Sequence, residues 1–174
     1  DLFIHSLTKF ATGAGDVMGG AVIGNGETMR RVRAEFRQLG SQLDPHSASL
    51  MVRGMKTYFV RYRAQSANAL AVAQWLAARP EVVNVRYPGL PENRFHALAS
   101  KQMRDFGVVV TFDLRAGAEA GRRFAEALAL FANTASLGST ESLIVPPQMM
   151  GGKDLSPQER EWSDIRDGSI RLSI

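Results

Sequence analysis

Hydrophobic positions along this chain alternate between two spacings, short contiguous runs and repeats every three or four residues. The first spacing is typical of buried strands and the second of amphipathic helices. Strands are predicted at 2–4, 21–23, 82–88, 107–114 and 169–174. Helices are predicted at 29–39, from 45 onward, and at 68–79, 94–103 and 118–131. This alternation predicts an α/β fold, and it leaves the order of the strands open.

Capping residues mark several helix boundaries. Asp44 followed by Pro45 is typical of a helix start, because a carboxylate caps backbone N–H groups and proline suits the first turn. Pro80 ends the long helix that precedes it. Ser156 and Glu159 match a capping box, which predicts a short helix near the end of the chain. The helix predicted over 118–131 has one apolar stripe, made of Phe124, Leu128 and Phe131.

Composition fits one ordinary domain or parts of two. The 174 residues are 45% hydrophobic and 22% charged, which argues against a disordered chain. The absence of cysteine excludes disulfides and thiolate metal sites, and the three histidines lie too far apart to predict a metal site. No apolar run reaches membrane length, so a cytoplasmic protein is expected. Because the chain begins and ends inside apolar runs, we expect it to be part of a longer polypeptide.

One stretch, MRRVRAEFR at residues 29–37, is locally basic within a chain of net charge +4. A nucleic-acid site would need this stretch to form a basic stripe interleaved with aromatic side chains. Instead, Met29, Val32 and Phe36 recur at helical spacing, and the arginines fall mostly on the other faces. The pattern favours the solvated side of an amphipathic helix over a nucleic-acid site.

The segment HSLTKF at residues 5–10 carries the first candidate chemistry. An amine used in covalent catalysis must be partly desolvated or lie near groups that lower its pKa. Pyridoxal phosphate (PLP) meets this need, because a lysine bonds to its aldehyde while nearby hydroxyl groups bind its phosphate. Lys9 would be that lysine, and an extended segment would point Ser6 and Thr8 to the same side. By itself the pattern is weak, and it favours the ordinary alternative of a solvated lysine after a strand.

Further segments accompany HSLTKF in collinear order. They read LDPHSASLMVRGMKT at 43–57, VVNVRYPGLP at 82–91, SLGSTESL at 136–143 and DGSIRLSI at 167–174. With these motifs the whole chain resembles the Cys/Met-metabolism family of PLP-dependent enzymes. This family includes cystathionine γ-synthase, cystathionine γ-lyase, cystathionine β-lyase, methionine γ-lyase and the homoserine-ester sulfhydrylases.

The resemblance implies an aspartate aminotransferase-like, fold-type I PLP-dependent enzyme of which this chain is the C-terminal half. Residues 1–55 would end the large PLP-binding domain, and residues 56–174 would form a small C-terminal α/β domain that is incomplete at its end. The missing half would carry the glycine-rich phosphate cradle, the ring stacked on PLP and the aspartate paired with its pyridine nitrogen. The family further implies a homo-oligomer, a dimer of dimers with shared active sites.

Site roles follow from the same resemblance. Lys9 would be the catalytic lysine, which bonds to PLP and moves protons during the reaction. Ser6 and Thr8 would bind the cofactor phosphate. Arg171 would bind the α-carboxylate of the substrate, and Ser136 would contact both this carboxylate and the lysine. Leu137 would also be a substrate-binding residue.

Alternation along the last strand supports the role of Arg171. Ile170, Leu172 and Ile174 would face a core, and Arg171 would then face the opposite side. A guanidinium in a cleft suits bidentate binding of a carboxylate. The alternatives are a surface arginine on a strand and, for Ser136, an ordinary loop serine before a glycine turn.

The sequence also departs from the family pattern. Ala14 stands where a histidine is common, Pro146 replaces the usual histidine before a proline, and Gly151-Gly152 replaces a common Thr-His pair. Cystathionine-handling γ-enzymes often have glutamate at the position of Ala135, which therefore favours a substrate with an apolar distal end. β-Lyases usually have tryptophan at the position of Leu137, which argues against β-elimination.

These residues predict elimination or replacement at Cγ of a sulfur amino acid or an activated homoserine. The enzyme would be active only together with the missing N-terminal half. One alternative is a cystathionine β-lyase. An alternative of another class is a non-catalytic fragment that serves as a dimer-interface scaffold.

Overall fold

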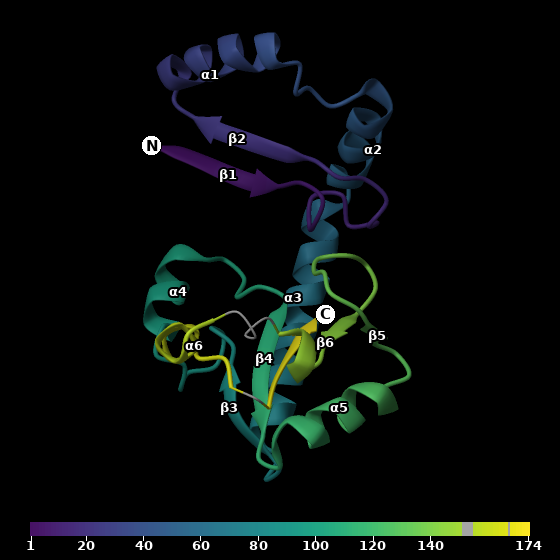
Figure 1. Ribbon diagram of the computed structural model, residues 1–174, viewed down its shortest axis with the longest axis vertical. Coiled ribbons are helices and arrows are strands. Elements are labelled where there is room, and N and C mark those ends of the chain that lie inside the picture. The colour runs from purple at the N-terminus through teal and green to yellow at the C-terminus, as the bar shows by residue number, and fades with distance from the viewer. Residues whose placement is uncertain (151–154, 167) are drawn as a thin grey trace. The chain divides into compact units, whose positions relative to one another are not determined.

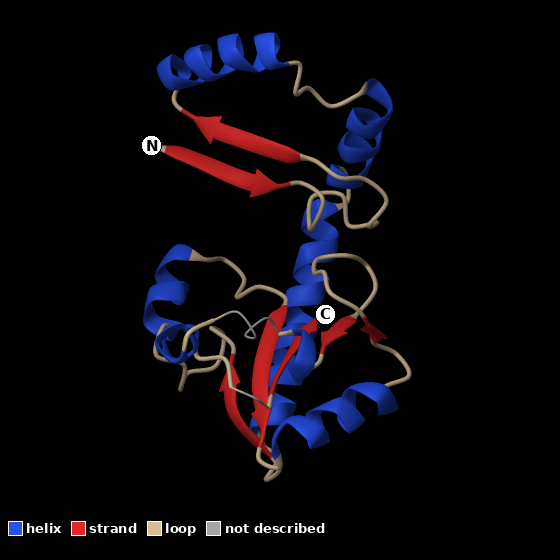
Figure 2. Ribbon diagram, in the orientation of Figure 1, coloured by secondary structure: helices blue, strands red, loops and turns tan. Residues whose placement is uncertain are grey.

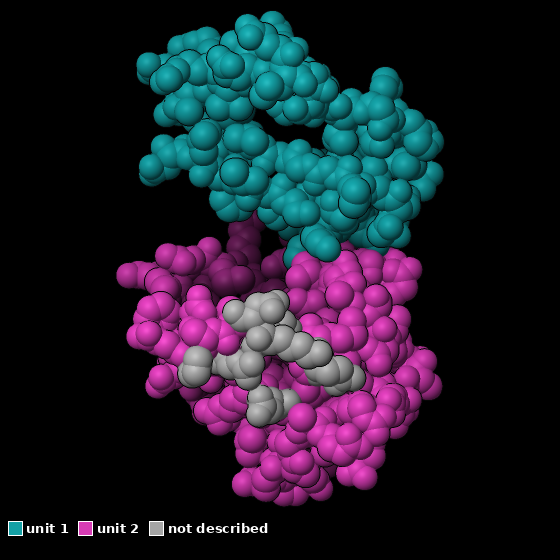
Figure 3. All heavy atoms as spheres, in the orientation of Figure 1, with its two compact units in different colours: residues 1–60 teal, residues 61–174 magenta. Residues whose placement is uncertain are grey.

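The computed structural model describes residues 1–150, 155–166 and 168–174 (Figure 1). The chain divides into two compact units, unit 1 at Asp1–Val60 and unit 2 at Arg61–Ile174 (Figure 3). Each unit contains its own sheet, and helix α3 (Tyr58–Ala77) runs across the boundary between them. The predicted division into a cofactor-domain segment and a small domain at residues 55 and 56 stays a prediction.

Unit 1 consists of an antiparallel hairpin and two helices (Figure 2). The strands are β1 (Leu2–Ser6) and β2 (Gly20–Gly24), followed by α1 (Gly26–Leu39) and α2 (Pro45–Met55). The predicted start of α2 is confirmed, because the Asp44 carboxylate accepts a hydrogen bond of 3.0 Å from the Ser47 backbone N–H. The basic stretch is helical, as the apolar spacing indicates, and α1 buries none of its residues within this chain.

Unit 2 is built on a five-stranded mixed sheet of order β3-β4-β7-β6-β5. All neighbouring pairs are antiparallel except β5 and β6, which are parallel. β4 and β7 occupy the second and third positions and pair along their full lengths. The strands are β3 (Val82–Arg86), β4 (Val109–Leu114), β5 (Ala132–Asn133), β6 (Leu143–Val145) and β7 (Ser169–Ser173).

Helices complete unit 2 around a core that lies on one side of the central strands. Phe112, Ile144 and Ile170 have no exposed surface, and they pack with Ala69 and Ala73 of α3. The other helical elements are α4 (His96–Gln102), α5 (Gly117–Ala127), the 3₁₀ turn η1 (Pro147–Met149) and α6 (Pro157–Ser163). The predicted capping box is confirmed, since the Ser156 hydroxyl accepts from the Glu159 N–H and the Glu159 carboxylate accepts from the Ser156 N–H.

The helix predicted over 118–131 was drawn too long. It ends at Ala127, and Leu128 has extended backbone angles that lead the chain into the short strand β5. Its apolar stripe is nevertheless used as expected, because Phe124, Leu128 and Phe131 are half-buried against the core. The spacing of these apolar residues reflects which side chains are buried, and it continues past Ala127, where the helix ends.

Candidate active site

The predicted site residues fall into two groups, one in each unit. Ser6, Thr8 and Lys9 lie on or just after β1 in unit 1. Ser136 and Arg171 lie together in unit 2, joined by a hydrogen bond. The first group lies in residues 6–13, which we call the lysine loop. We call the cavity around Arg171 the carboxylate pocket.

The lysine loop is a hydrogen-bonded turn. Strand β1 ends at Ser6, and the backbone N–H groups of Leu7 and Thr8 both donate to the Gly19 carbonyl, at 2.9 and 3.3 Å. The N–H of Gly13 donates to the Lys9 carbonyl at 3.0 Å. Strand alternation therefore ends before Thr8, so it does not set the relative directions of the Ser6 and Thr8 side chains. The turn sets the position of the Lys9 backbone.

The two hydroxyl groups near Lys9 have different environments. The Thr8 hydroxyl accepts from the Gly19 N–H at 2.9 Å and donates to the Gly19 carbonyl at 3.3 Å, so it ties the loop to the start of β2. Ser6 is exposed, and its hydroxyl makes no hydrogen bond within the residues that the structure describes. Ser6 thus has a free donor and acceptor at the mouth of the loop.

Helix α2 packs against the lysine loop through Gly54, a residue to which the sequence analysis gave no role. A Cβ on Gly54 would lie 2.4 Å from the Thr12 carbonyl oxygen and 2.7 Å from its Cα, so this close approach requires glycine. The Thr12 hydroxyl in turn donates to the Thr8 carbonyl at 3.1 Å. The only sequence signal was a glycine inside a predicted helix, which is typical of a close backbone contact.

This loop fits a cofactor that carries an aldehyde and a phosphate. Lys9 supplies the amine from a braced and half-buried turn, and Ser6 supplies a hydroxyl without an internal partner. Thr8 can donate to a phosphate only if its proton leaves the 3.3 Å bond to Gly19. Among the described residues, no group of three or more histidine or acidic side chains gathers as metal ligands would.

The carboxylate pocket in unit 2 has a volume of about 410 Å³. Its polar lining residues include Arg86, Asp164 and Arg171, and its apolar lining residues include Ala135 and Val145. Leu137, expected beside the substrate, is half-buried and does not line this cavity. Of the family departures, Pro146 is fully buried next to β6, and Gly151-Gly152 lies outside the described residues.

Arg171 is oriented as strand alternation predicts. Ile170 and Leu172 are buried in the core, and Arg171 lines the cavity on the opposite face of β7. One of its terminal nitrogens donates to the Ser136 carbonyl at 2.8 Å. Its Nε is buried and has no hydrogen-bond partner in the part of the chain that the structure describes, and burial lowers the pKa of the guanidinium. A buried donor without an acceptor is unfavourable, so the pocket is prepared for an anionic group.

The loop that carries Ser136 is strained and firmly held. Ser136 has φ 152°, a region that residues other than glycine rarely adopt and that is frequent at functional sites. Besides the contact with Arg171, the Gly138 N–H donates to the Ser173 hydroxyl at 3.0 Å, and Gln65 donates to the Ser139 carbonyl at 2.7 Å. Sequence reasoning gave no role to Gln65 or Ser173, since only the tertiary fold brings them to this loop.

An ion pair with the buried Asp113 carboxylate holds Arg86, which also lines the pocket. Both Arg86 terminal nitrogens donate to the Asp113 carboxylate, at 2.6 and 3.0 Å, and the hydroxyl of Ser169 and the amide of Asn84 donate to it at 2.6 and 3.1 Å. Burial alone would raise the pKa of Asp113, but these hydrogen bonds outweigh it and hold the pKa below its ordinary value. Arg86 also lies 3.6 Å from Asp164, which lines the same cavity.

A PLP-dependent enzyme of amino-acid metabolism requires a lysine amine for the cofactor aldehyde and a cationic group for the substrate carboxylate. The lysine loop can supply the amine, and Arg171 can supply the cationic group. The α/β architecture is that of fold type I. The sequence model of the Cys/Met metabolism PLP-dependent enzymes matches residues 1–174, and the chain belongs to this family.

Individual relatives agree with the family. The chain is 40% identical to the O-succinylhomoserine sulfhydrylase of Pseudomonas aeruginosa, with 100% of this chain and 43% of the relative covered. It is 40% identical to the L-methionine gamma-lyase of Pseudomonas putida, with 100% and 44% covered. A crystal structure of cystathionine gamma synthase from Xanthomonas oryzae pv. oryzae superposes with a TM-score of 0.93 at 38% identity, covering 100% of this chain and 45% of that structure.

The chain thus spans less than half the length of the relatives that it matches. These relatives differ in activity, since one is a sulfhydrylase, one a lyase and one a synthase. Family membership therefore rests on the full length of this chain, and these relatives cover several reactions. No helix in the described residues is long and apolar enough to cross a membrane.

Proposed function

We propose that the whole protein containing this chain eliminates or replaces the γ-substituent of a sulfur amino acid or an activated homoserine. The observation that carries this proposal is the unpaired, buried Nε of Arg171 in a pocket of about 410 Å³. A substrate carboxylate there would supply the missing acceptor and would fix the amino acid in one orientation.

Lys9 would move the protons. When bound, PLP withdraws electrons from the carbon that bears the substrate amino group, which makes the proton on that Cα acidic. We assign Lys9 Nζ to remove this proton and to carry protons between Cα and the departing side chain. Ser6 would donate its free hydroxyl to the cofactor phosphate, and Thr8 would hold the loop through Gly19 and complete the phosphate contact.

Ser136 would help Arg171 to present the carboxylate. Its carbonyl occupies one guanidinium nitrogen, which leaves Nε and the remaining nitrogens for the substrate. Because the strained backbone of Ser136 is held by neighbouring hydrogen bonds, its position is set before the substrate binds.

The apolar lining residues of the pocket favour a substrate with an apolar distal end. Ala135, Val145 and Ile165 belong to this lining, and none of them can pair with a charged group. A thioether such as the side chain of methionine suits this surface better than a second carboxylate. The cystathionine β-lyase alternative has no side chain in the described pocket to favour it.

The test is to incubate the full-length protein, loaded with PLP, with cystathionine, methionine and O-succinylhomoserine plus sulfide. Cleavage of cystathionine at Cγ yields 2-oxobutyrate, ammonia and cysteine, whereas cleavage at Cβ yields pyruvate, ammonia and homocysteine. We expect 2-oxobutyrate, or succinate release coupled to formation of a new thiol. Pyruvate as the main keto acid would establish the β-lyase alternative. No product and no visible absorbance of bound PLP would leave only the scaffold alternative.

We also propose that the full-length protein is a homo-oligomer with shared active sites. Unit 1 leaves apolar side chains of β1 and β2 uncovered within this chain, so they require further protein surface. Light scattering of the full-length protein should give a mass that is a multiple of the single chain, and a monomeric mass would contradict the proposal.

A further inference from the structure

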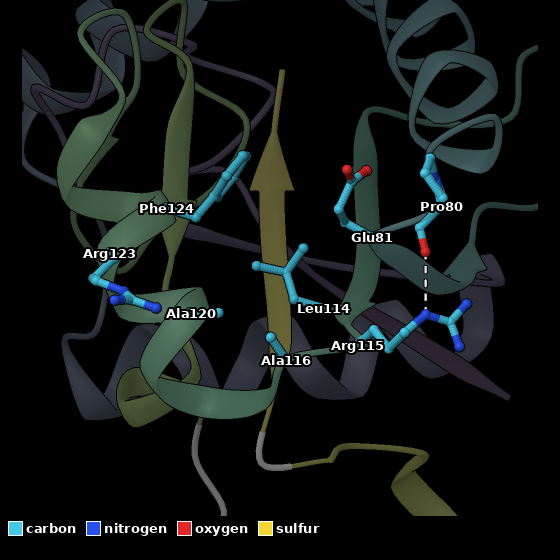
Figure 4. A pocket seen from close by; sticks show the side chains of 8 residues that line it. All are labelled: Pro80, Glu81, Leu114, Arg115, Ala116, Ala120, Arg123 and Phe124. Atoms are coloured by element: carbon cyan, nitrogen blue, oxygen red, sulfur yellow. Dashed lines mark hydrogen bonds between the residues drawn. The ribbon is translucent and has the colours of Figure 1, made fainter.

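Unit 2 has a second cavity that shares no residue with the carboxylate pocket. Its volume is about 650 Å³, which is in the range of small-molecule sites. Apolar side chains from two elements face this cavity, Leu114 at the end of β4 and Ala120 and Phe124 on α5 (Figure 4). Its charged lining residues are Glu81, Arg115 and Arg123.

The walls of this cavity are held by the fold. The Arg115 side chain donates from Nε to the Pro80 carbonyl at 3.1 Å, as Figure 4 shows, and its backbone N–H donates to the Glu81 carbonyl at 2.9 Å. On the other wall, Leu114 and Phe124 pack against the hydrophobic core. A ligand would therefore meet a preformed surface and would not have to order it.

Two adjacent arginines on α5 differ in their partners. Arg122 is held by Glu119 at 2.7 Å and by Glu126 at 2.6 Å, along the exposed side of the helix. Arg123 lines the cavity, and it makes no hydrogen bond or ion pair within the part of the chain that the structure describes. The Glu119 and Glu126 carboxylates form hydrogen bonds with Arg122, whereas Arg123 feels Glu119 only through its charge, so the Arg123 guanidinium keeps its hydrogen-bond donors for a ligand.

We propose that this cavity binds a small amphipathic monoanion, a monocarboxylate with a medium-length acyl chain or an aromatic ring. The apolar body would lie against Leu114, Ala120 and Phe124, and the carboxylate would bind Arg123. With two arginines and one glutamate, the lining carries one net positive charge, which balances one carboxylate. Glu81 disfavours a second negative charge. An alkylammonium ion of the same length would meet the positive charge of Arg123 and be repelled.

Octanoate is the probe, compared with octylamine and 1-octanol, each titrated calorimetrically into the full-length protein. We expect octanoate to bind at least about tenfold more tightly than either analogue, because only the carboxylate gains a charge-assisted hydrogen bond. Arg123→Gln should weaken octanoate about tenfold and leave 1-octanol unchanged. Arg122→Gln, the matched control on the paired side of α5, should change octanoate binding less than about twofold.

A second variant tests the cavity itself. Ala120→Trp would fill the apolar part, so it should abolish binding of both octanoate and 1-octanol, with far-UV circular dichroism as the check on folding. The proposal is overturned if octanoate does not bind, which includes the case that another part of the full-length protein covers the cavity. It is equally overturned if Arg123→Gln and Arg122→Gln weaken octanoate alike, because the carboxylate would then respond only to the general charge of the helix. Because Arg123 is exposed, its variant keeps the test decisive even if Ala120→Trp fails to fold.

Discussion

The two units differ in how completely each buries its own apolar residues. In unit 2, Phe112, Ile144 and Ile170 are fully enclosed by a five-stranded sheet and its helices. In unit 1, Phe3 is 59% exposed and Ile4 is 76% exposed, although they are neighbours on one strand. Adjacent strand residues point to opposite faces, so both faces of this hairpin are apolar and uncovered within the chain.

This difference separates a self-contained region from a dependent one. Strands with apolar residues on both faces are typical of a sheet covered by helices on both sides. We therefore expect β1 and β2 to need protein surface that this chain does not provide, whereas unit 2 already contains a core. The catalytic candidate Lys9 lies in the dependent region, and the carboxylate pocket lies in the self-contained one.

The largest expected effect separates chemistry from stability in unit 1. Lys9→Ala in the full-length protein should lower kcat by at least about a thousandfold, because the proton-transfer group is lost. Its melting temperature should change little, since the loop is braced by Thr8, Thr12 and Gly54, which remain. Lys56→Ala, an exposed lysine of the same unit, is the control. Turnover close to that of the parent protein would remove Lys9 from the mechanism.

Amide hydrogen exchange tests the comparison directly. In the 174-residue chain alone, amides of β1 and β2 should exchange at least about a hundredfold faster than those of β4 and β7. The reason is that a two-stranded hairpin is marginal by itself, whereas β4 and β7 are flanked on both sides within their sheet. Equal protection of the two hairpin strands and the two central strands would show that unit 1 is as self-contained as unit 2.

The next expected effect is on kcat/KM, and it comes from replacing Arg171, the proposed carboxylate-binding residue of unit 2. Arg171→Lys keeps the charge but loses the planar fork, so kcat/KM should fall about thirty- to a thousandfold, or about 2–4 kcal/mol. The visible absorbance of bound PLP should remain, because the cofactor needs no substrate carboxylate. The comparison substrate is the decarboxylated amine, for which parent and variant should be nearly equal. Equal losses with amino acid and amine would make Arg171 a structural residue.

How much the sequence predicts also differs between the two regions. The strand–helix order and the orientation of Arg171 follow from periodicity, because Ile170 and Leu172 mark the core face of β7. The enzyme family follows from the sequence motifs around Lys9 and Ser136. The bracing contacts do not, since Gly54 and Thr12 are distant in sequence and no pattern links them.

The same limit applies to short strands and buried polar groups. β5 has two residues and β6 three, too few for an alternation to be visible. Asp113 is a polar residue in an apolar strand, and its partners Arg86 and Ser169 come from β3 and β7. Only the pairing of those strands with β4 on either side brings the three together.

The last expected effect is on stability and comes from Asp113. Asp113→Asn would remove the bidentate carboxylate of Arg86 and leave only its longer contact of 3.6 Å with Asp164, which should lower the free energy of unfolding by about 3 kcal/mol at neutral pH. Glu119→Gln, an exposed ion-pair carboxylate in the same unit, is the control and should have a much smaller effect. Because the folded-state pKa of Asp113 lies below its ordinary value of 3.8, its contribution is present above that pH and is lost as the pH falls through the folded-state pKa. Urea unfolding at several pH values should therefore show a constant difference between parent and variant near neutrality, and a shrinking one below about pH 3.8. A difference that persists at low pH would mean that Asp113 stabilises unit 2 through its shape and hydrogen bonds rather than its charge.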